Sequence, residues 1–257
     1  MDLTLLKGLK VLETLAYSDR PRGVSDLASE MDLPKSNIHR TLQTLISAGY
    51  VRSEHGSSLY RCTLKVFEMA SAVVSRIDVR GNAEPLMQVL GEQTRETIHL
   101  SVLDQLDVIY LHKVESPQPV RAYSTIGGRA PAYCVASGKS LLAHQSEQWL
   151  RQLPQTLRMY TSETLTDADD LRREFARVRM QGYAVNRGEW RETVGGVATI
   201  VRDVTGQPVA AIGVSGPIDR MRSNLEQHIP LVISAGRETS KLLGCRNYDA
   251  TTPMTEG

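Results

Sequence analysis

The 257-residue sequence predicts an α+β protein with a small helical domain followed by a larger mixed domain. The first observation is three short amphipathic helix patterns followed by two short strand patterns around a turn, all within residues 1–63. The second is a change after Gly81, where short groups of strand-forming residues are separated by helices without a regular βαβ repeat. This second pattern argues against a Rossmann-like nucleotide domain and favours a largely antiparallel sheet.

Residues 1–63 have the element order of a winged helix-turn-helix domain. We expect Ser25 to cap the second helix, Pro34 to lie in the first turn of the third, and Gly49 to end it. The expected elements are helices over residues 3–18, 26–31 and 34–48, and strands over residues 50–53 and 59–63 with residues 55–58 as their loop.

The third helix combines a buried stripe, formed by Ile38, Leu42 and Leu45, with a polar outer face. Lys, Ser and Thr suit phosphate contacts, whereas Asn, Arg and Gln suit base edges, and the N-terminal half of such a helix meets the bases. The predicted DNA-binding residues are Ser25, Lys35, Ser36, Asn37, His39, Arg40, Thr41, Gln43 and His55.

The charge balance gives no independent support for a nucleic-acid partner. Formal net charge is +1 for the chain, and residues 1–63 carry eight Lys or Arg against seven Asp or Glu. We therefore expect weak nonspecific DNA binding from one domain, strengthened by a dimer that uses two half-sites. The alternative is a protein-interaction module with a solvated polar face.

The remainder of the chain divides into a linker, a second domain and a tail. Apolar residues cover more than one face of a helix over residues 64–80, so we expect this linker helix to pack on a second subunit; burial inside one subunit is the alternative. Residues 81–245 form the second domain, and the polar tail over residues 246–257 is expected to be disordered. The expected elements are helices over residues 83–94, 137–144, 147–153, 166–181 (capped by Thr166) and 230–243, strands over residues 97–103, 107–114, 120–124, 183–186, 197–202 and 209–215, and a loop over residues 125–131.

No catalytic or metal-binding motif is complete. The run Gly138-Lys139-Ser140 partly matches a phosphate-binding loop, but Tyr133 stands where that motif needs glycine. A helix starting here either offers free N–H groups to an anion such as a carboxylate or is a plain helix start. His99 and His112 fall on neighbouring predicted strands, either as a pair or as separate structural histidines. We expect no cofactor, no metal and no nucleophilic serine.

Cysteine usage and hydropathy indicate a cytoplasmic protein. The three cysteines lie far apart, which argues against a disulfide framework. No secretory signal is recognisable at the N-terminus, and no apolar run approaches the roughly 20 residues of a membrane helix.

An ordered set of landmarks resembles the IclR-type transcriptional regulators. The run from Pro34-Lys35-Ser36 through Arg40-Thr41-Leu42 to Gly49-Tyr50-Val51 is similar to the helix-turn-helix of that family. Further landmarks stand at residues 97–103, 113–116, 136–143, 182–184 and 209–217. The resemblance covers residues 3–244. It implies a winged helix-turn-helix, a linker helix and a GAF-like effector domain, assembled as homodimers or homotetramers on palindromic DNA.

The resemblance also implies a binding site for a small organic acid. Carried over by motif position, the effector-binding residues are Val135, Ala136, Ser137, Asn186, Glu189, Gly196, Gly213, Val214 and Ser215. Family members that bind small oxo-acids often show an acid near Asn186, a cysteine near Gly196 and a serine near Gly213. Because those groups are changed here and glycine makes room, we expect a bulkier effector, an aromatic acid, with Arg129, Arg187, Glu189 or Trp190 nearby.

These patterns together predict a ligand-responsive transcriptional regulator of a catabolic operon that binds double-stranded DNA and is not an enzyme. The alternative is a small-molecule enzyme with a DNA-binding appendage.

Overall fold

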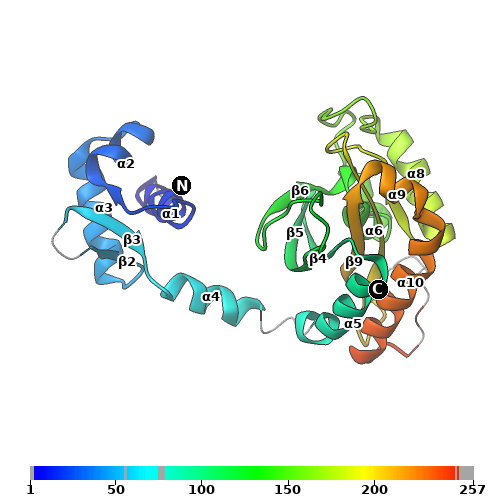
Figure 1. Cartoon of the computed structure of the whole chain (residues 1–257). Helices are drawn as coiled ribbons and strands as arrows, with labels where there is room; N and C mark the ends of the chain where they lie inside the picture. The colour runs from blue at the N-terminus through cyan, green and yellow to red at the C-terminus, as the bar shows by residue number, and fades with distance from the viewer. Residues whose placement is uncertain (1–2, 55–56, 75–78, 247, 249–257) are drawn as a thin grey trace. The chain divides into compact units, whose positions relative to one another are not determined.

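The computed structural model describes residues 3–54, 57–74, 79–246 and 248, and the chain separates into two compact units. The first unit comprises Met1–Ile77 and the second Asp78–Gly257 (Figure 1).

The first unit is a winged helix-turn-helix domain followed by one further helix. A core of buried side chains from the first three helices includes Val11, Leu27, Ile38 and Leu42. The short strands form an antiparallel sheet in the order β1-β3-β2. The elements are α1 (Leu3–Ala16), β1 (Arg22–Gly23), α2 (Val24–Glu30), α3 (Lys35–Ser47), β2 (Val51–Ser53), β3 (Leu59–Cys62) and α4 (Lys65–Val74).

Helix α3 begins and ends where the sequence predicts. Pro34 immediately precedes it with φ near −58°, which the proline ring favours. Gly49 has φ of +77°, and the N–H groups of Gly49 and Tyr50 donate to the carbonyls of Ile46 and Leu45 at 2.9 Å each. This pattern of two bonds closes the helix as a Schellman motif.

Two details of the first unit differ from expectation. Ser25 does not cap α2, because Gly23 precedes that helix without a side-chain bond and Ser25 lies exposed in the first turn. The leucine stripe of α1 is only partly buried: Leu15 is in the core, whereas Leu3 and Leu6 are 61% and 51% exposed.

The second unit is a six-stranded antiparallel sheet with helices on both faces. Its strand order is β6-β5-β4-β9-β8-β7. The strands are β4 (Thr97–Asp104), β5 (Asp107–Val114), β6 (Arg129–Pro131), β7 (Ala184–Asn186), β8 (Val194–Arg202) and β9 (Pro208–Pro217). The helices are α5 (Val79–Thr94), the 3-10 turn η1 (Ala132–Cys134), α6 (Ala136–Leu142), α7 (Glu147–Leu150), α8 (Ala168–Gln181), α9 (Ile218–Ser223) and α10 (Leu225–Leu242).

Strand alternation assigns these helices to faces. Ala198 and Thr199 are neighbours on β8, so their side chains point to opposite faces of the sheet. Ala198 lines one cavity together with Ala136 and Ser137 of α6, whereas Gly236 of α10 lies against the Thr199 methyl. Helix α5 packs beside α10, and α8 packs on α6 (Figure 1). The fold class predicted from the sequence is confirmed.

Five predictions for the second unit are wrong in detail. Residues 120–124 are not a strand, because side chains hold their carbonyls: Thr97 bonds to Ala122 at 3.3 Å and Lys113 to Ser124 at 2.8 Å. The strand beside β5 is instead β6, inside the stretch expected to be a loop.

The other corrections concern helix ends and the tail. Asp167 rather than Thr166 caps α8, since its carboxylate accepts from two backbone N–H groups at 2.9 and 3.1 Å. Helix α10 starts at Leu225, with Pro230 inside it. In the tail expected to be disordered, Tyr248 packs against the sheet, where its hydroxyl bonds to the Ile200 carbonyl at 3.1 Å; residues 247 and 249–257 lie outside the described residues.

Candidate DNA-recognition surface and ligand pocket

The predicted DNA-binding side chains lie on the outer face of α3 and at the start of α2. Ser25, Lys35, Ser36, His39, Arg40 and Gln43 are exposed, and Asn37 and Thr41 are half-buried. The Arg40 guanidinium donates to the Asn37 amide oxygen at 3.3 Å, which brings two candidate base-reading groups together. His55 lies outside the described residues.

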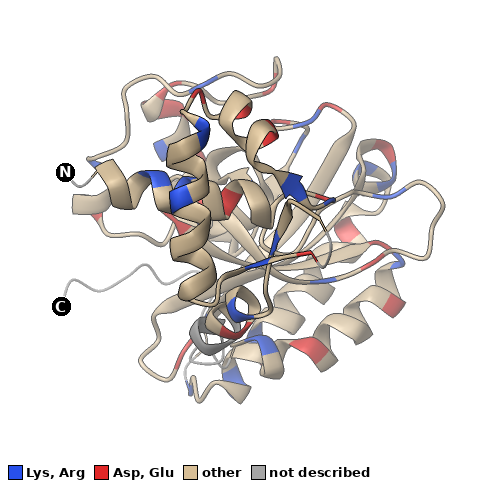
Figure 2. Ribbon diagram, turned by 90° about the vertical axis from the view of Figure 1, so that its left-hand side faces the viewer, with Lys and Arg blue, Asp and Glu red and all other residues tan. Residues whose placement is uncertain are grey.

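Charge on this unit is mixed rather than concentrated. Arg22 pairs with Glu30 at 2.6 Å, and Arg61 pairs with Glu54 at 2.8 Å. Within the described residues, neither Lys35 nor Arg40 forms an ion pair with a carboxylate. Over the whole chain, Figure 2 shows basic and acidic positions interspersed along the ribbon. The surface therefore offers local donors on α3 without a strong long-range field.

Eight of the nine predicted effector positions line one pocket in the second unit. This sheet pocket lies between the start of α6, strands β4, β8 and β9, and the segment over residues 122–124. Its predicted members are Val135, Ala136, Ser137, Asn186, Gly196, Gly213, Val214 and Ser215; the other lining residues are His99, Tyr110, Ala122, Tyr123, Ser124, Trp190, Arg191, Val194, Val197 and Ala198.

A buried histidine organises the polar part of the sheet pocket. His99 Nε2 is 2.6 Å from the Ser124 hydroxyl, and its Nδ1 is 3.2 Å from the Ser215 hydroxyl. Burial, with a further contribution from the charge of Lys113, lowers the pKa of His99 to about 4, so the ring is neutral near pH 7. The Tyr110 ring lies 4.7 Å from the His99 ring, and burial raises the pKa of Tyr110 to about 12.

An arginine and a tryptophan lie side by side on the pocket wall. The Arg191 guanidinium is 4.7 Å from the centre of the Trp190 ring. Of the residues expected nearby, Trp190 lines the pocket, but Arg129 pairs with Asp104 and Asp107 and is not a lining residue.

Several lining residues were not predicted from the sequence. His99 carries a usable signal, since it shares a strand pattern with the matched landmark over residues 97–103. Arg191 follows Trp190 directly in the sequence, and Trp190 was predicted to lie near the effector. Tyr123 and Ser124 had no signal, because only the tertiary fold brings their segment over the sheet.

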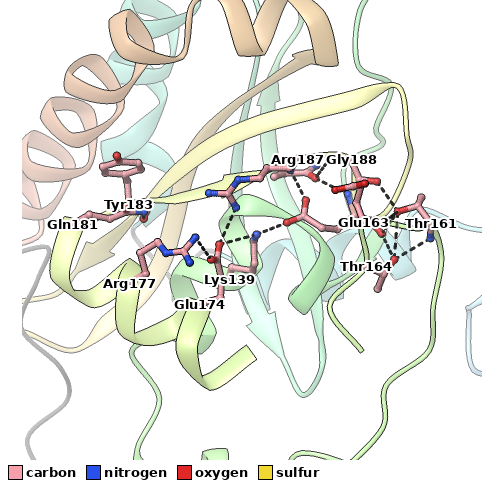
Figure 3. A network of polar contacts seen from close by, with 12 residues as sticks. Lys139, Thr161, Glu163, Thr164, Glu174, Arg177, Gln181, Tyr183, Arg187 and Gly188 are labelled. Carbon is pink, nitrogen blue, oxygen red and sulfur yellow. Dashed lines mark hydrogen bonds and ion pairs between the residues drawn. The ribbon is translucent and has the colours of Figure 1, made fainter. Parts of the chain in front are cut away.

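Glu189 does not line the sheet pocket. Its carboxylate is 3% exposed and lies 2.5 Å from the ammonium of Lys139. Lys139, the lysine of the partial phosphate-loop motif, is fully buried and also contacts Glu174 at 3.1 Å, so its ammonium faces carboxylates rather than an anion site. Figure 3 shows Lys139 and Glu174 in this polar network, with Arg187 beside them.

The two strand histidines do not meet. His99 pairs in register with Lys113, and His112 with Leu100, so the histidines point to opposite faces. His112 Nε2 instead lies 3.6 Å from a carboxylate oxygen of Glu84 on α5. Among the described residues, no group of three or more His, Cys, Asp or Glu side chains has the arrangement of a metal site.

Comparison with known proteins matches both units to one family. The bacterial transcriptional regulator IclR C-terminal domain matches residues 71–241, and the IclR helix-turn-helix domain matches residues 4–55. The chain belongs to the IclR family. Among its IclR-family relatives is the HTH-type transcriptional regulator KdgR of Escherichia coli K12, which is 32% identical over 248 residues, covering 95% of this chain and 94% of KdgR.

Solved structures agree with this assignment. IclR of Thermotoga maritima has a TM-score of 0.79 at 28% identity and covers 94% of this chain and 98% of its own. An IclR homologue from Microbacterium hydrocarbonoxydans, solved with 4-hydroxybenzoate, has a TM-score of 0.82 at 24% identity, covering 93% and 98% of the two chains, and is similar in fold.

The family assignment decides between the expected functions. The curated relatives are DNA-binding transcriptional regulators and not enzymes, so the prediction of a regulator is confirmed and the alternative of an enzyme with a DNA-binding appendage is set aside. Every helix in the described part of the chain is too short or too polar to span a membrane.

Proposed function

We propose that this IclR-family regulator binds a palindromic operator through α3 and responds to an aromatic carboxylic acid in the sheet pocket. The observation that carries the proposal is the convergence of eight motif-matched positions on one pocket that also holds Arg191. Among the described lining residues, Arg191 is the one with a permanent positive charge.

The lining supports an aromatic carboxylate as the class of effector. A guanidinium binds a carboxylate through two parallel hydrogen bonds. The rings of Tyr110, Tyr123 and Trp190 supply flat apolar surface on which an aromatic ring packs. A regulator of the same fold was solved with 4-hydroxybenzoate.

Exposed apolar side chains support action as a homodimer or homotetramer. On α4, Phe67 is 69% exposed, and on α1 Leu5 is 61% exposed. A single DNA-binding unit with almost no net charge binds DNA weakly. Two units bound to the two halves of a palindrome double the number of DNA contacts. Occupancy of the sheet pocket then shifts the equilibrium between assemblies whose α3 helices match or mismatch the operator of a catabolic operon in the cytoplasm.

A gel-shift titration tests the proposal. The DNA is the region upstream of the chain's own coding sequence, and the acids are benzoate, 4-hydroxybenzoate, pyruvate and glyoxylate. We expect an aromatic acid to change the retardation of the wild-type protein. Arg40→Ala should weaken DNA binding by about 10- to 100-fold, the loss typical of a base contact. Arg191→Gln should bind DNA normally and lose the response.

Arg151→Gln is the matched control, because it removes the same charge from an exposed position in the second unit. It should change neither DNA binding nor the response. Unchanged DNA affinity in Arg40→Ala contradicts the role of α3, and stronger binding of pyruvate or glyoxylate than of either aromatic acid contradicts the effector class.

A further inference from the structure

A closed ring of charged contacts lies behind the sheet pocket. The Lys139 ammonium is 2.5 Å from Glu189 Oε1 and 3.1 Å from Glu174 Oε1. Arg187 Nη1 is 3.1 Å from the same oxygen of Glu174, and the backbone N–H of Arg187 donates to Glu189 Oε2. Dashed lines in Figure 3 follow the contacts from Lys139 through Glu174 to Arg187. We call these four residues the charge ring.

The charge ring is stable only when it is complete. Lys139, Glu174 and Glu189 are 0%, 4% and 3% exposed, so each charge has given up most of its hydration. Within the charge ring, Lys139 and Arg187 stand against Glu174 and Glu189. Burial alone would raise the pKa of Glu174, but Lys139 and Arg187 outweigh it and hold the pKa below its usual value. Loss of one member leaves a buried charge without its partner, which is strongly unfavourable.

The charge ring connects two walls of the sheet pocket. Lys139 belongs to α6, whose residues Ala136 and Ser137 line the pocket. Glu189 belongs to the 187–193 loop, which carries the lining residues Trp190 and Arg191.

The two walls are held to different degrees. Helix α6 is fixed to the sheet, since Ser140 bonds to Ala198 at 2.9 Å and an added Cβ at Gly138 would lie 2.2 Å from the Ala132 carbonyl oxygen. The 187–193 loop is irregular, and its backbone is held largely by side chains. Thr161 and Thr164 donate to the carbonyls of Gly188 and Glu189 at 2.8 and 2.6 Å. The loop is therefore the wall that side-chain contacts hold in place, among them the two contacts of the Glu189 carboxylate in the charge ring.

We propose that Lys139 and Glu189 are positioning residues for effector binding: the charge ring fixes the 187–193 loop so that Trp190 and Arg191 face the sheet pocket, and effector affinity depends on that placement. This inference rests on the proposed function of the pocket. Neither Lys139 nor Glu189 lines the pocket, so both act through the loop.

The expected size of the effect follows from the loop's equilibrium. When only a fraction of the molecules has the binding-competent loop, the apparent dissociation constant rises by the inverse of that fraction. If breaking the ring leaves about one molecule in ten with the loop in place, affinity falls about tenfold.

Two measurements on the full-length chain test the inference. Hydrogen–deuterium exchange of residues 186–191 reports the loop without any ligand, and calorimetric titration with benzoate and 4-hydroxybenzoate reports affinity. The variants are Glu189→Gln, which keeps the side-chain shape, and Lys139→Met. Arg177→Gln is the control, because Arg177 contacts the other oxygen of Glu174 at 3.1 Å from outside the ring.

We expect Glu189→Gln to speed exchange selectively at residues 186–191 and to weaken binding about tenfold or more, while exchange in β4 and β9 and free-state DNA binding stay unchanged. Arg177→Gln should behave as wild type. Unchanged loop exchange in Glu189→Gln, equal effects in Arg177→Gln, or faster loop exchange with unaltered affinity would each overturn the inference. If the wild-type chain binds neither acid, the effector class is wrong and the exchange comparison alone decides the role of the ring.

Discussion

At the scale of single residues, the sheet pocket depends on the neutral state of His99. A neutral imidazole has one N–H group and one bare nitrogen. Of the two hydroxyls that contact His99, one must therefore donate to the ring and the other must accept from it. The accepting serine keeps its own O–H free, so the pocket offers a hydroxyl donor whose direction is set by the histidine tautomer.

This neutrality predicts a pH dependence of stability. The unfolded imidazole takes up a proton below its ordinary pKa of 6.5, whereas the buried ring of His99 takes one up only near pH 4. The stabilisation that the neutral His99 ring gives the folded state is therefore present above pH 6.5 and is lost as the pH falls to 4. Replacing His99 with Gln should reduce the loss of unfolding free energy between pH 6.5 and pH 4 by about 3 kcal/mol.

Urea unfolding followed by far-ultraviolet circular dichroism at several pH values measures this difference. Other titrating groups are common to both proteins, so the comparison isolates His99. A variant whose stability falls with pH as steeply as that of the wild type would show that folding does not lower the pKa of the His99 ring.

At the scale of elements, close backbone approach limits which residues the pocket walls tolerate. A Cβ at Gly138 would lie 2.2 Å from the carbonyl oxygen of Ala132, because α6 packs directly on η1. At Gly213 it would lie 2.6 Å from the Ala198 Cβ, and at Gly196 it would lie 2.8 Å from the Val214 carbonyl oxygen. These glycines are thus required by packing, and the extra room that they give the pocket is a consequence.

The substitution Gly138→Ala should destabilise the second unit by about 1–3 kcal/mol, the usual cost of overpacking. The atoms that a methyl group would meet are backbone atoms, so no side-chain rotation relieves the contact. Differential scanning calorimetry should show a lower transition temperature for the second unit. An unchanged transition would mean that η1 moves away from α6 freely.

Helices and strands of the second unit with periodic apolar residues were predictable from the sequence. Segments whose backbone is held by hydrogen bonds from distant side chains were not. Helix α8 was predictable because Leu171, Phe175 and Val178 recur at helical spacing and are fully buried. Residues 120–124 resemble a strand in composition, but tertiary hydrogen bonds hold them in another conformation. Motif position located most of the pocket, whereas Glu189 was assigned to it because sequence gives a residue's place and not the direction of its side chain.

At the scale of the whole molecule, α1 and α4 of the first unit each expose large apolar side chains. Leu3, Leu5 and Leu6 on α1 and Phe67 and Met69 on α4 are all more than half exposed. Several large exposed apolar side chains on one helix often mark a contact with another protein. We propose a second copy of the same chain as the partner, because the proposed palindromic operator would present two equivalent half-sites.

Replacing Phe67 with Glu should shift the assembly toward the monomer, because it places a charge on this surface. Sedimentation velocity over a concentration series measures the shift, which we expect to raise the dissociation constant at least tenfold. Met180→Glu is the matched control, since Met180 is 80% exposed on α8 of the second unit. Unchanged sedimentation of the Phe67 variant would place the subunit contact elsewhere.

The position of Trp190 gives the protein a built-in optical reporter. The chain has two tryptophans, Trp149 and Trp190, and both lie in the second unit. Only Trp190 lines the sheet pocket, beneath the Arg191 guanidinium. An arginine that turns toward a bound carboxylate changes the charge over that indole and hence its emission. We therefore expect intrinsic fluorescence to follow occupancy of the pocket by the proposed effector without a dye, and the tryptophan-free DNA-binding unit adds nothing to the signal.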